Sequence, residues 1–278
     1  MRQLNFQKKY QTASQRNNSL LCIGLDTDIS KLPKSVLDRS NPVLYFNKKI
    51  IDATSDLVCC YKPNYAFYGV LGDRGWSTLR ETIEYIPKDI PVLVDAKIGD
   101  IGNTSSLYAK MFFEELGADA LTVTPYMGED CVLPFLDYKD RTTFIVCLTS
   151  NKGANDFEKI ISDGSPLFEY VINKALEWSP NKNCGLVIGA TQPKYFSLVR
   201  SLAPDMPLLI PGVGAQGGNP KEVVENGQDS KGSGILVNSS RGIIFASAKE
   251  DYAPAARTAA KNLRDELNKY RNYPSLSS

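Results

Sequence analysis

The 278-residue sequence contains no histidine. Imidazole is the common general base near neutral pH, the partner of serine or cysteine in nucleophile pairs, and the most frequent zinc ligand. None of these uses is open to this chain. Acid–base chemistry must therefore be carried by lysine, aspartate or glutamate side chains.

Long apolar runs and an excess of charge of one sign are also missing. No apolar run approaches the roughly 18 residues that a membrane-spanning helix needs, so we expect none to cross a membrane. Lysine and arginine number 32 against 31 acidic residues, without a long block of one sign. We therefore expect no nucleic-acid or anionic-membrane partner, and a small molecule becomes the expected ligand.

The cysteines lack the CxxC spacing of many metal and redox sites. They lie mostly inside apolar, strand-like runs, as buried reduced thiols do, and this predicts a cytoplasmic protein without a disulfide framework. The six are Cys22, Cys59, Cys60, Cys131, Cys147 and Cys184.

Short apolar runs rich in β-formers alternate with longer stretches of helical period. The predicted strands are Leu21–Leu25, Leu57–Tyr61, Ile90–Val94, Ala120–Thr124, Thr143–Leu148, Gly185–Ile188, Pro207–Ile210 and Gly234–Val237. The predicted helices between them include Val43–Leu57, Ser105–Leu116, Leu167–Trp178 and Tyr195–Leu202. This alternation predicts the α/β class and a (β/α)8 TIM barrel of about 250 residues. An open doubly wound sheet is the alternative, but no GxGxxG turn follows the first strand.

We expect a single barrel domain over residues 1–278, with a short N-terminal helix at about 1–18 and a frayed tail at about 271–278. The first twenty residues carry basic and no acidic side chains, as transit peptides do, but Phe6 and Tyr10 instead mark an amphipathic helix. The polar stretch 151–165 is a candidate mobile loop over the site.

Polar side chains fall where several predicted strands end. Asp26 follows the first strand, Lys62 the second and Ser150 the fifth. Alone, each has a structural explanation: Asp26 as a helix cap, Lys62 as a snorkelling lysine and Ser150 as a turn residue. Because the carboxyl ends of barrel strands meet, their convergence predicts an active site.

The third predicted strand adds two charges and a third just beyond it. Asp95 and Lys97 are two residues apart, so on a regular strand both side chains leave the same face. Asp100 can fold back from the loop that follows. If the second and third strands are neighbours, Lys62 joins this array. A salt-bridged barrel plug is the structural alternative, but buried ion pairs stabilise little after desolvation, so the cluster favours a reactive site.

An anion site is predicted from the loops after the seventh and eighth strands. Residues 211–218, with sequence PGVGAQGG, can bring main-chain N–H groups close to phosphate oxygens, and Arg241 can offer a two-pronged contact. Barrels commonly build phosphate sites from these two loops.

The ten residues from Asp95 to Thr104, DAKIGDIGNT, resemble the D-x-K-x-x-D-I-x-N-T pattern of the orotidine 5′-phosphate decarboxylase family. The likeness spans nearly the whole chain and favours the longer bacterial form, although Ile98 stands where that form usually carries arginine. Its other matching segments are Asn18–Asp26, Lys62–Asn64, Leu148–Asn151, Pro211–Gly218 and Ser240–Gly242.

The resemblance implies a function and a role for each site residue. It implies decarboxylation of orotidine 5′-monophosphate to uridine 5′-monophosphate in pyrimidine biosynthesis, without metal or cofactor. The implied charged tetrad is Lys62, Asp95, Lys97 and Asp100, with Lys97 as proton donor. The implied substrate contacts are Asp26 and Thr104 for the ribose, Ser150 for the pyrimidine, and Gln216, Gly217 and Arg241 for the phosphate. A homodimer is also implied, in which Asp100 and Thr104 reach the partner's site.

Three other functions remain open at this point. Related barrels with a similar D-x-K-x-x-D string are Mg²⁺-dependent sugar-phosphate decarboxylases or synthases, although Thr104 and the chain length favour the nucleotide enzyme. A Schiff-base aldolase would use Lys62 or Lys97 as its nucleophile. A catalytically silent nucleotide-binding barrel is the third.

Overall fold

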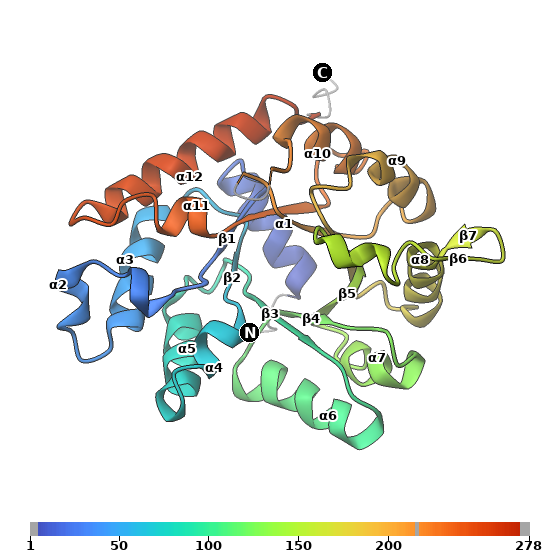
Figure 1. Ribbon diagram of the computed structural model, residues 1–278, viewed down its shortest axis with the longest axis horizontal. Coiled ribbons are helices and arrows are strands. Elements are labelled where there is room, and N and C mark those ends of the chain that lie inside the picture. The colour runs from blue at the N-terminus through green and yellow to red at the C-terminus, as the bar shows by residue number, and fades with distance from the viewer. Residues whose placement is uncertain (1–4, 215–216, 273–278) are drawn as a thin grey trace.

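The computed structural model describes residues 5–214 and 217–272. Over these residues eight parallel strands form a barrel inside a ring of helices (Figure 1). The strands pair in the order β2, β1, β10, β9, β8, β5, β4, β3. Parallel bridges from Tyr61 to Val92 and from Asn64 to Asp95 join β2 to β3 and close the barrel. The chain is a single-domain (β/α)8 barrel, so the open-sheet alternative is wrong.

The barrel strands are β1 (Leu21–Gly24), β2 (Cys60–Lys62), β3 (Leu93–Ile98), β4 (Ala120–Val123), β5 (Thr142–Leu148), β8 (Cys184–Ile188), β9 (Leu208–Pro211) and β10 (Ile235–Ser239). The helices are α1 (Phe6–Arg16), α2 (Lys34–Leu37), α3 (Pro42–Thr54), α4 (Tyr65–Gly69), α5 (Asp73–Tyr85), α6 (Gly102–Lys110), α7 (Glu129–Leu136), α8 (Leu167–Trp178), α9 (Pro193–Leu202), α10 (Pro220–Gly227), α11 (Arg241–Ile244) and α12 (Tyr252–Asn268). A hairpin of β6 (Ile161–Ser162) and β7 (Ser165–Pro166) lies between β5 and α8.

Most elements lie close to their predicted positions, and α8 has the predicted bounds. The third strand differs, because β3 spans Leu93–Ile98 rather than Ile90–Val94. The second strand differs as well, because β2 begins at Cys60 rather than Leu57. Side chains before β1 explain the difference: Ser19 Oγ donates to the carbonyl of Leu57, and Asn17 Nδ2 donates to that of Val58. The strand ladder starts only after these two carbonyls.

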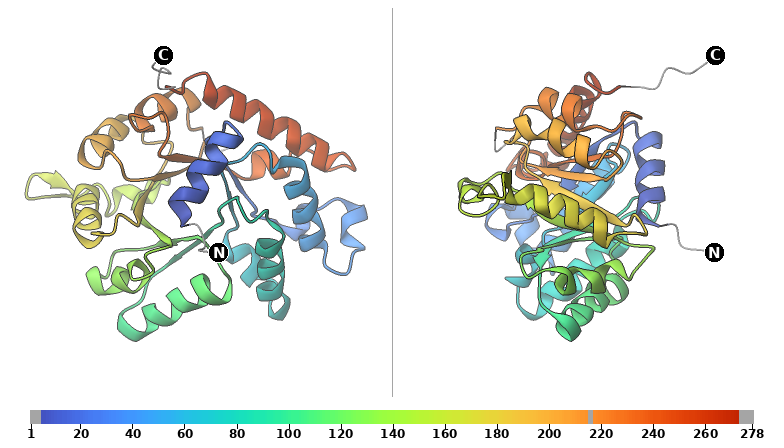
Figure 2. Two further views of the ribbon diagram at one scale, coloured as in Figure 1. Left: turned by 180° about the vertical axis from the view of Figure 1, so that it is seen from behind. Right: turned by 90° about the vertical axis from the view of Figure 1, so that its right-hand side faces the viewer.

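The N-terminal helix α1 covers the amino-terminal end of the barrel, in front of the strands in the left panel of Figure 2. Phe6 packs edge-on against Phe144 of β5, with ring centroids 5.6 Å apart. Tyr10 Oη donates to the carbonyl of Ile235 at 2.9 Å. Lys9 adds a 2.6 Å ion pair with Asp119, which lies just before β4. Helix α1 therefore closes this end with apolar and polar contacts.

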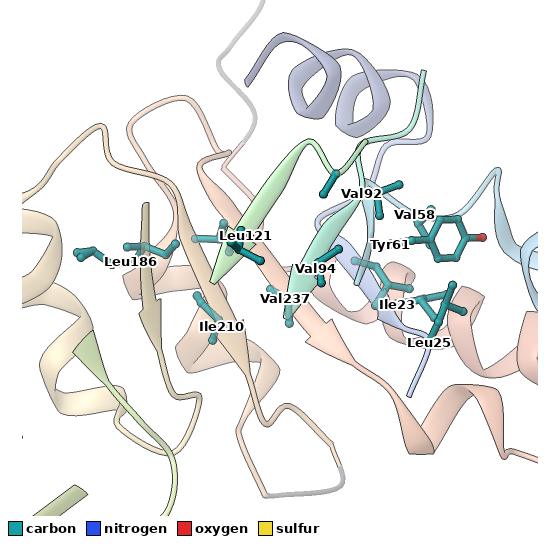
Figure 3. Close-up of a cluster of buried hydrophobic side chains, with 14 of the residues drawn as sticks. Ile23, Leu25, Val58, Tyr61, Val92, Val94, Leu121, Leu186, Ile210 and Val237 are labelled. Atoms are coloured by element: carbon teal, nitrogen blue, oxygen red, sulfur yellow. The ribbon is translucent and has the colours of Figure 1, made fainter. Parts of the chain in front are cut away.

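Apolar side chains pack on both faces of the barrel wall. One set faces the surrounding helices and includes Ile23, Val94, Leu121 and Val237 (Figure 3). The second set fills the barrel interior above α1. Its members on the strands include Cys22, Cys60, Leu93, Phe144, Val187, Leu209 and Leu236. This packing leaves the carboxyl ends of the strands as the place for a pocket.

In the described residues no helix is both long and apolar enough to cross a lipid bilayer. All six cysteines are buried free thiols.

Candidate active site

A pocket lies at the carboxyl ends of the barrel strands. The sequence-predicted residues that line it are Asp26, Lys62, Asp95, Lys97, Ser150 and Arg241. They come from β2 and β3 and from the segments that follow β1, β5 and β10. The barrel thus brings together side chains that lie far apart in the sequence.

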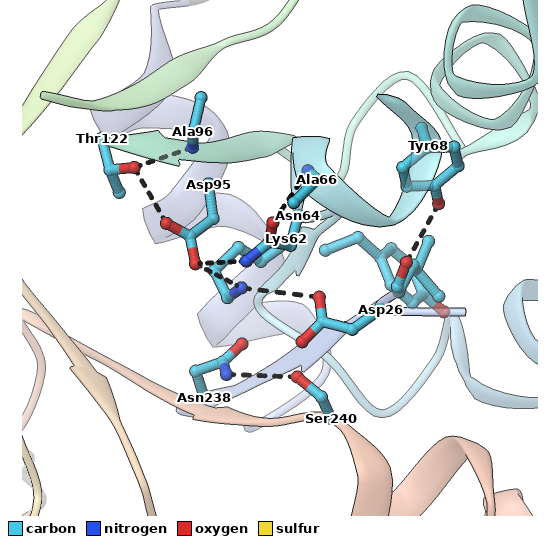
Figure 4. A network of polar contacts seen from close by, with 12 residues as sticks. Asp26, Lys62, Asn64, Ala66, Tyr68, Asp95, Ala96, Thr122, Asn238 and Ser240 are labelled. Atoms are coloured by element: carbon cyan, nitrogen blue, oxygen red, sulfur yellow. Dashed lines mark hydrogen bonds and ion pairs between the residues drawn. The ribbon is translucent and has the colours of Figure 1, made fainter. Parts of the chain in front are cut away.

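The carboxylate of Asp95 binds two ammonium groups. Lys62 Nζ donates to Oδ2 of Asp95 at 3.0 Å, and Lys97 Nζ donates to Oδ1 at 2.6 Å. Lys62 Nζ also lies 3.8 Å from Oδ1 of Asp26. Figure 4 marks this ion pair with a dashed line. Positive and negative groups therefore alternate across the floor of the pocket.

Burial and charge act in opposite directions on the pKa values of this cluster. Burial disfavours the charged form of Lys62, which is only 2% exposed, but the carboxylates of Asp26 and Asp95 raise its pKa above the usual lysine value. Burial also disfavours the carboxylate of Asp95, yet Lys62 and Lys97 hold its pKa well below the usual range. Lys62 and Asp95 are therefore both ionised at neutral pH.

Strand β3 is not regular where it carries these residues. Val94 pairs with Leu121 and Ile98 with Val123, so three residues of β3 lie opposite one residue of β4. Lys97 has φ +48°, in the left-handed region that non-glycine residues rarely adopt. Asp95 and Lys97 share the pocket as predicted, but a bulge rather than simple strand alternation places Lys97 there.

Ser150 is held by contacts on the preceding residue, Thr149, and on its own main chain. Glu158 accepts hydrogen bonds from both the N–H and the hydroxyl of Thr149, at 2.7 and 2.8 Å. Thr191 Oγ1 donates to the carbonyl of Ser150 at 3.1 Å. A Cβ atom at Gly189 would lie 2.5 Å from the nitrogen of Ser150, so only glycine allows β8 to approach this closely.

The start of the glycine-rich segment and Arg241 both line the pocket. Gly212 and Val213 follow β9, and Arg241 follows the neighbouring strand β10. Gly212 and Gly214 have φ values of +102° and +80°, which favour glycine. Arg241 makes no ion pair with a described residue, so its guanidinium can bind an anion.

Two residues predicted for the phosphate are not seen in the pocket. Gln216 lies outside the described residues. Gly217 has φ +85° and donates its N–H to the carbonyl of Gly214, and it is not among the described residues that line the pocket.

Asp100 and Thr104 also lie away from the pocket of their own chain. Asp100 Oδ1 accepts a hydrogen bond from the N–H of Ile101, and Thr104 is exposed on the first turn of α6. Three of the four predicted tetrad residues are therefore together in one chain, and the fourth is not.

Two asparagines in the pocket have no individual role in the sequence-based prediction. Asn64 Oδ1 caps α4, and its Nδ2 lies 3.3 Å from Oδ2 of Asp95. Asn238 is 6% exposed in β10, and its Oδ1 has no hydrogen-bond partner among the described residues, nor has Oδ1 of Asp26. These two buried acceptors are suited to hydroxyl or N–H donors of a ligand.

No group of three or more cysteine, aspartate or glutamate side chains within residues 5–214 and 217–272 is arranged to hold a metal ion.

Known proteins resemble this chain over most of its length. A model of the orotidine 5′-phosphate decarboxylase / HUMPS family matches residues 19–256. An orotidine 5′-phosphate decarboxylase of Bacteroides fragilis is 48% identical over 256 residues, covering 91% of this chain and 93% of the relative.

Two solved structures from Leishmania donovani are similar in fold. The OMP decarboxylase gives a TM-score of 0.85 at 38% identity and covers 96% of this chain and 99% of its own. The UMP synthase gives a TM-score of 0.86 at 39% identity, and the match covers 96% of this chain and 57% of the UMP synthase chain.

Replacing Asp95 with asparagine tests the charge cluster. The variant leaves two ammonium groups without their shared carboxylate, so we expect the free energy of unfolding at pH 7 to fall by about 3 kcal/mol or more. Because the pKa of Asp95 is lowered by folding, its stabilising contribution is complete above about pH 4 and is lost as the pH falls further. The difference between wild type and Asp95→Asn should therefore narrow from about pH 4 to pH 2 in urea unfolding.

The control is Asp38→Asn, which changes an exposed carboxylate at the end of α2 and should leave the unfolding curves nearly unchanged. If the difference in free energy of unfolding between wild type and Asp95→Asn stays constant down to pH 2, the role given to Asp95 is contradicted.

Proposed function

Because the chain belongs to the orotidine 5′-phosphate decarboxylase / HUMPS family, we propose that it converts orotidine 5′-monophosphate to uridine 5′-monophosphate and CO2 in pyrimidine biosynthesis. The observation that carries the proposal is the pair of ammonium groups on one buried carboxylate, in a pocket that also contains an arginine without an ion-pair partner among the described residues. It is a carboxy-lyase reaction that makes and breaks bonds at one ring carbon.

The reaction needs fixed positive charge. Loss of CO2 leaves an electron pair on a ring carbon with no adjacent carbonyl to accept it, so cations must stabilise that charge. An ammonium group about 4 Å away contributes about 4 kcal/mol at an effective dielectric constant of 20. Lys97 provides this ammonium group, because it lines the pocket near the carboxyl end of β3.

Lys97 also supplies the proton that replaces the carboxylate. Its N–H bond breaks as the new C–H bond forms, and the neutral amine regains a proton from water, to which this side chain is 47% exposed. Asp95 holds Lys97 through the 2.6 Å contact, and Lys62 adds a second, buried cation.

The remaining stabilisation comes from binding the nucleotide. Enzymes lower barriers by up to roughly 23 kcal/mol, far more than one lysine provides. Binding energy at the phosphate and ribose supplies the rest as the transition state forms. Arg241, Gln216 and Gly217 bind the phosphate, and Asp26 offers to a ribose hydroxyl its Oδ1, which accepts no hydrogen bond from the described residues. Ser150 contacts the pyrimidine ring.

The site is completed by a second copy of the chain. Asp100 and Thr104 do not line their own pocket, and large apolar side chains are exposed close to them in sequence and beside α7, against which α6 packs. These side chains are Ile101, Leu107, Tyr126 and Met127. A symmetric homodimer covers this surface and carries Asp100 and Thr104 into the partner's pocket.

The reaction takes place in the cytoplasm. The six buried free thiols are supporting evidence, since disulfides are rare in that compartment.

The direct test is an ultraviolet assay of orotidine 5′-monophosphate loss, run with and without excess EDTA. Turnover that persists in EDTA supports the metal-free mechanism. No loss of substrate by the purified dimer would overturn the proposed function, and borohydride trapping on a lysine with a carbonyl substrate would favour the aldolase.

Lys97→Ala should abolish most turnover. Removing about 4 kcal/mol of charge stabilisation lowers kcat by about a thousandfold or more. Binding of uridine 5′-monophosphate, measured by calorimetry, should change little because the product carries no developing charge. The matched control is Lys261→Ala, an exposed lysine on α12. Normal turnover in Lys97→Ala would refute the proton-donor assignment.

Arg241→Ala should mainly raise KM. A charge-assisted contact to phosphate contributes about 1.5 to 3 kcal/mol, which corresponds to an increase in KM of roughly 10- to 100-fold. A smaller decrease in kcat should accompany it, because part of the phosphate binding energy is realised only in the transition state. Arg74→Ala, an exposed arginine on α5, is the control in steady-state kinetics. Unchanged KM would place the phosphate elsewhere.

Mixing two inactive variants tests the shared site. Lys97→Ala and Asp100→Ala should each be inactive alone. After subunit exchange, a heterodimer has one site with Lys97 from one chain and Asp100 from its partner, so about one quarter of wild-type activity should return. If Asp100 acts in its own chain, the mixture stays inactive.

A further inference from the structure

Thr122 of β4 joins the main chain of β3 to the carboxylate at the centre of the site. It is fully buried and does not line the pocket. Its Oγ1 accepts hydrogen bonds from the N–H groups of Ala96 and Lys97, at 3.0 and 2.9 Å. The same hydroxyl donates to Oδ1 of Asp95 at 2.9 Å (Figure 4).

The chemistry of these partners fixes the direction of each hydrogen bond. Main-chain N–H groups can only donate, so the two lone pairs of the hydroxyl accept them. The ionised carboxylate of Asp95 can only accept, so the single hydroxyl proton points to it. The two lone pairs and the proton of the Thr122 hydroxyl are therefore all used, and these three hydrogen bonds hold the hydroxyl in one orientation.

The contacts lie where β3 departs from regular structure. Three residues of β3, from Asp95 to Lys97, lie opposite Thr122 alone, and Lys97 has the positive φ. Bulged strands lose ladder partners, and left-handed φ values in non-glycine residues persist only when surrounding contacts hold them. Thr122 supplies the partners for both N–H groups in the bulge.

We propose that Thr122 is a positioning residue for Lys97. Thr122 fixes Lys97 at two points. Its hydroxyl accepts a hydrogen bond from the main-chain N–H of Lys97, and it also donates to Oδ1 of Asp95, which accepts a hydrogen bond from Lys97 Nζ. It acts without touching the substrate. The predicted effect on kcat rests on the proposed function, but the predicted effect on the hydrogen bonds of β3 does not.

Valine and serine variants separate the hydroxyl from the shape of the side chain. Thr122→Val keeps the branched shape and removes the hydroxyl, whereas Thr122→Ser keeps the hydroxyl. The matched control is Thr143→Val in β5, because the buried Oγ1 of Thr143 has no hydrogen-bond partner among the described residues. A general cost of valine in a barrel strand would appear in both valine variants.

Amide hydrogen exchange provides the test that does not depend on activity. We expect the Ala96 and Lys97 amides to be protected in wild type and Thr122→Ser and to exchange at least about tenfold faster in Thr122→Val. Amides in β8 and β9 should be unaffected. Equal protection in wild type and Thr122→Val would overturn the proposal, whether or not the protein decarboxylates orotidine 5′-monophosphate.

The second test compares kcat and KM of the variants with those of wild type. A misplaced Lys97 should reduce kcat in Thr122→Val by about 10- to 100-fold, while KM and product binding change by less than about threefold. Thr122→Ser should restore most of kcat. A purely structural Thr122 would lower stability with kcat per folded enzyme unchanged, and that result overturns the proposal.

If Thr122→Val does not fold, Thr122→Cys replaces it in both measurements. A thiol is a weaker donor and acceptor than a hydroxyl, so exchange at Ala96 and Lys97 should lie above the wild-type rate. Wild-type exchange together with wild-type kcat in Thr122→Cys would overturn the proposal.

Discussion

The carboxylate of Asp95 is the interaction on which the rest of the site depends. It binds the ammonium groups of Lys62 and Lys97 at 3.0 and 2.6 Å, and without it the buried Lys62 would keep only its 3.8 Å contact with Asp26. Desolvation opposes the charges of Lys62 and Asp95, and each of these two ions is stable only because its neighbours are present. The site is therefore organised before any ligand arrives, which is what electrostatic stabilisation of a transition state requires.

The barrel makes this cluster possible because its amino-terminal end is closed to water. Helix α1 closes the amino-terminal end with Phe6 and Tyr10, and a layer of apolar side chains lies between it and the site. Val187 belongs both to that layer and to the pocket lining, so the apolar layer begins directly beneath the charged groups. A charge acts more strongly on a nearby charge when water is excluded, so the fold contributes to the chemistry as well as to stability.

The sequence alone predicts the barrel and most of the cluster, because hydrophobic period and strand-end position are local signals. Strand register is not local, and it decides which side chains meet across β3 and β4. Thr122 is unremarkable within the run Ala120–Val123, and only the bulge opposite it gives its hydroxyl three partners. Asn64 could have been noticed because it follows the second strand closely, two residues after Lys62. Asn238 follows an apolar run much as Asp26 does, and that shared position was the available signal.

The two halves of the site differ in how far they are fixed by the protein itself. Lys62, Asp95 and Lys97 hold one another, and Glu158 and Thr191 hold the segment around Ser150. Arg241 has no ion-pair partner among the described residues. In the proposed reaction, these contacts hold the reacting end of the site in place before the ligand binds, whereas Arg241 gains an ion-pair partner only when the phosphate binds. In that proposal, binding energy from the phosphate holds the pyrimidine ring against Lys97 and adds to the stabilisation that one ammonium group provides.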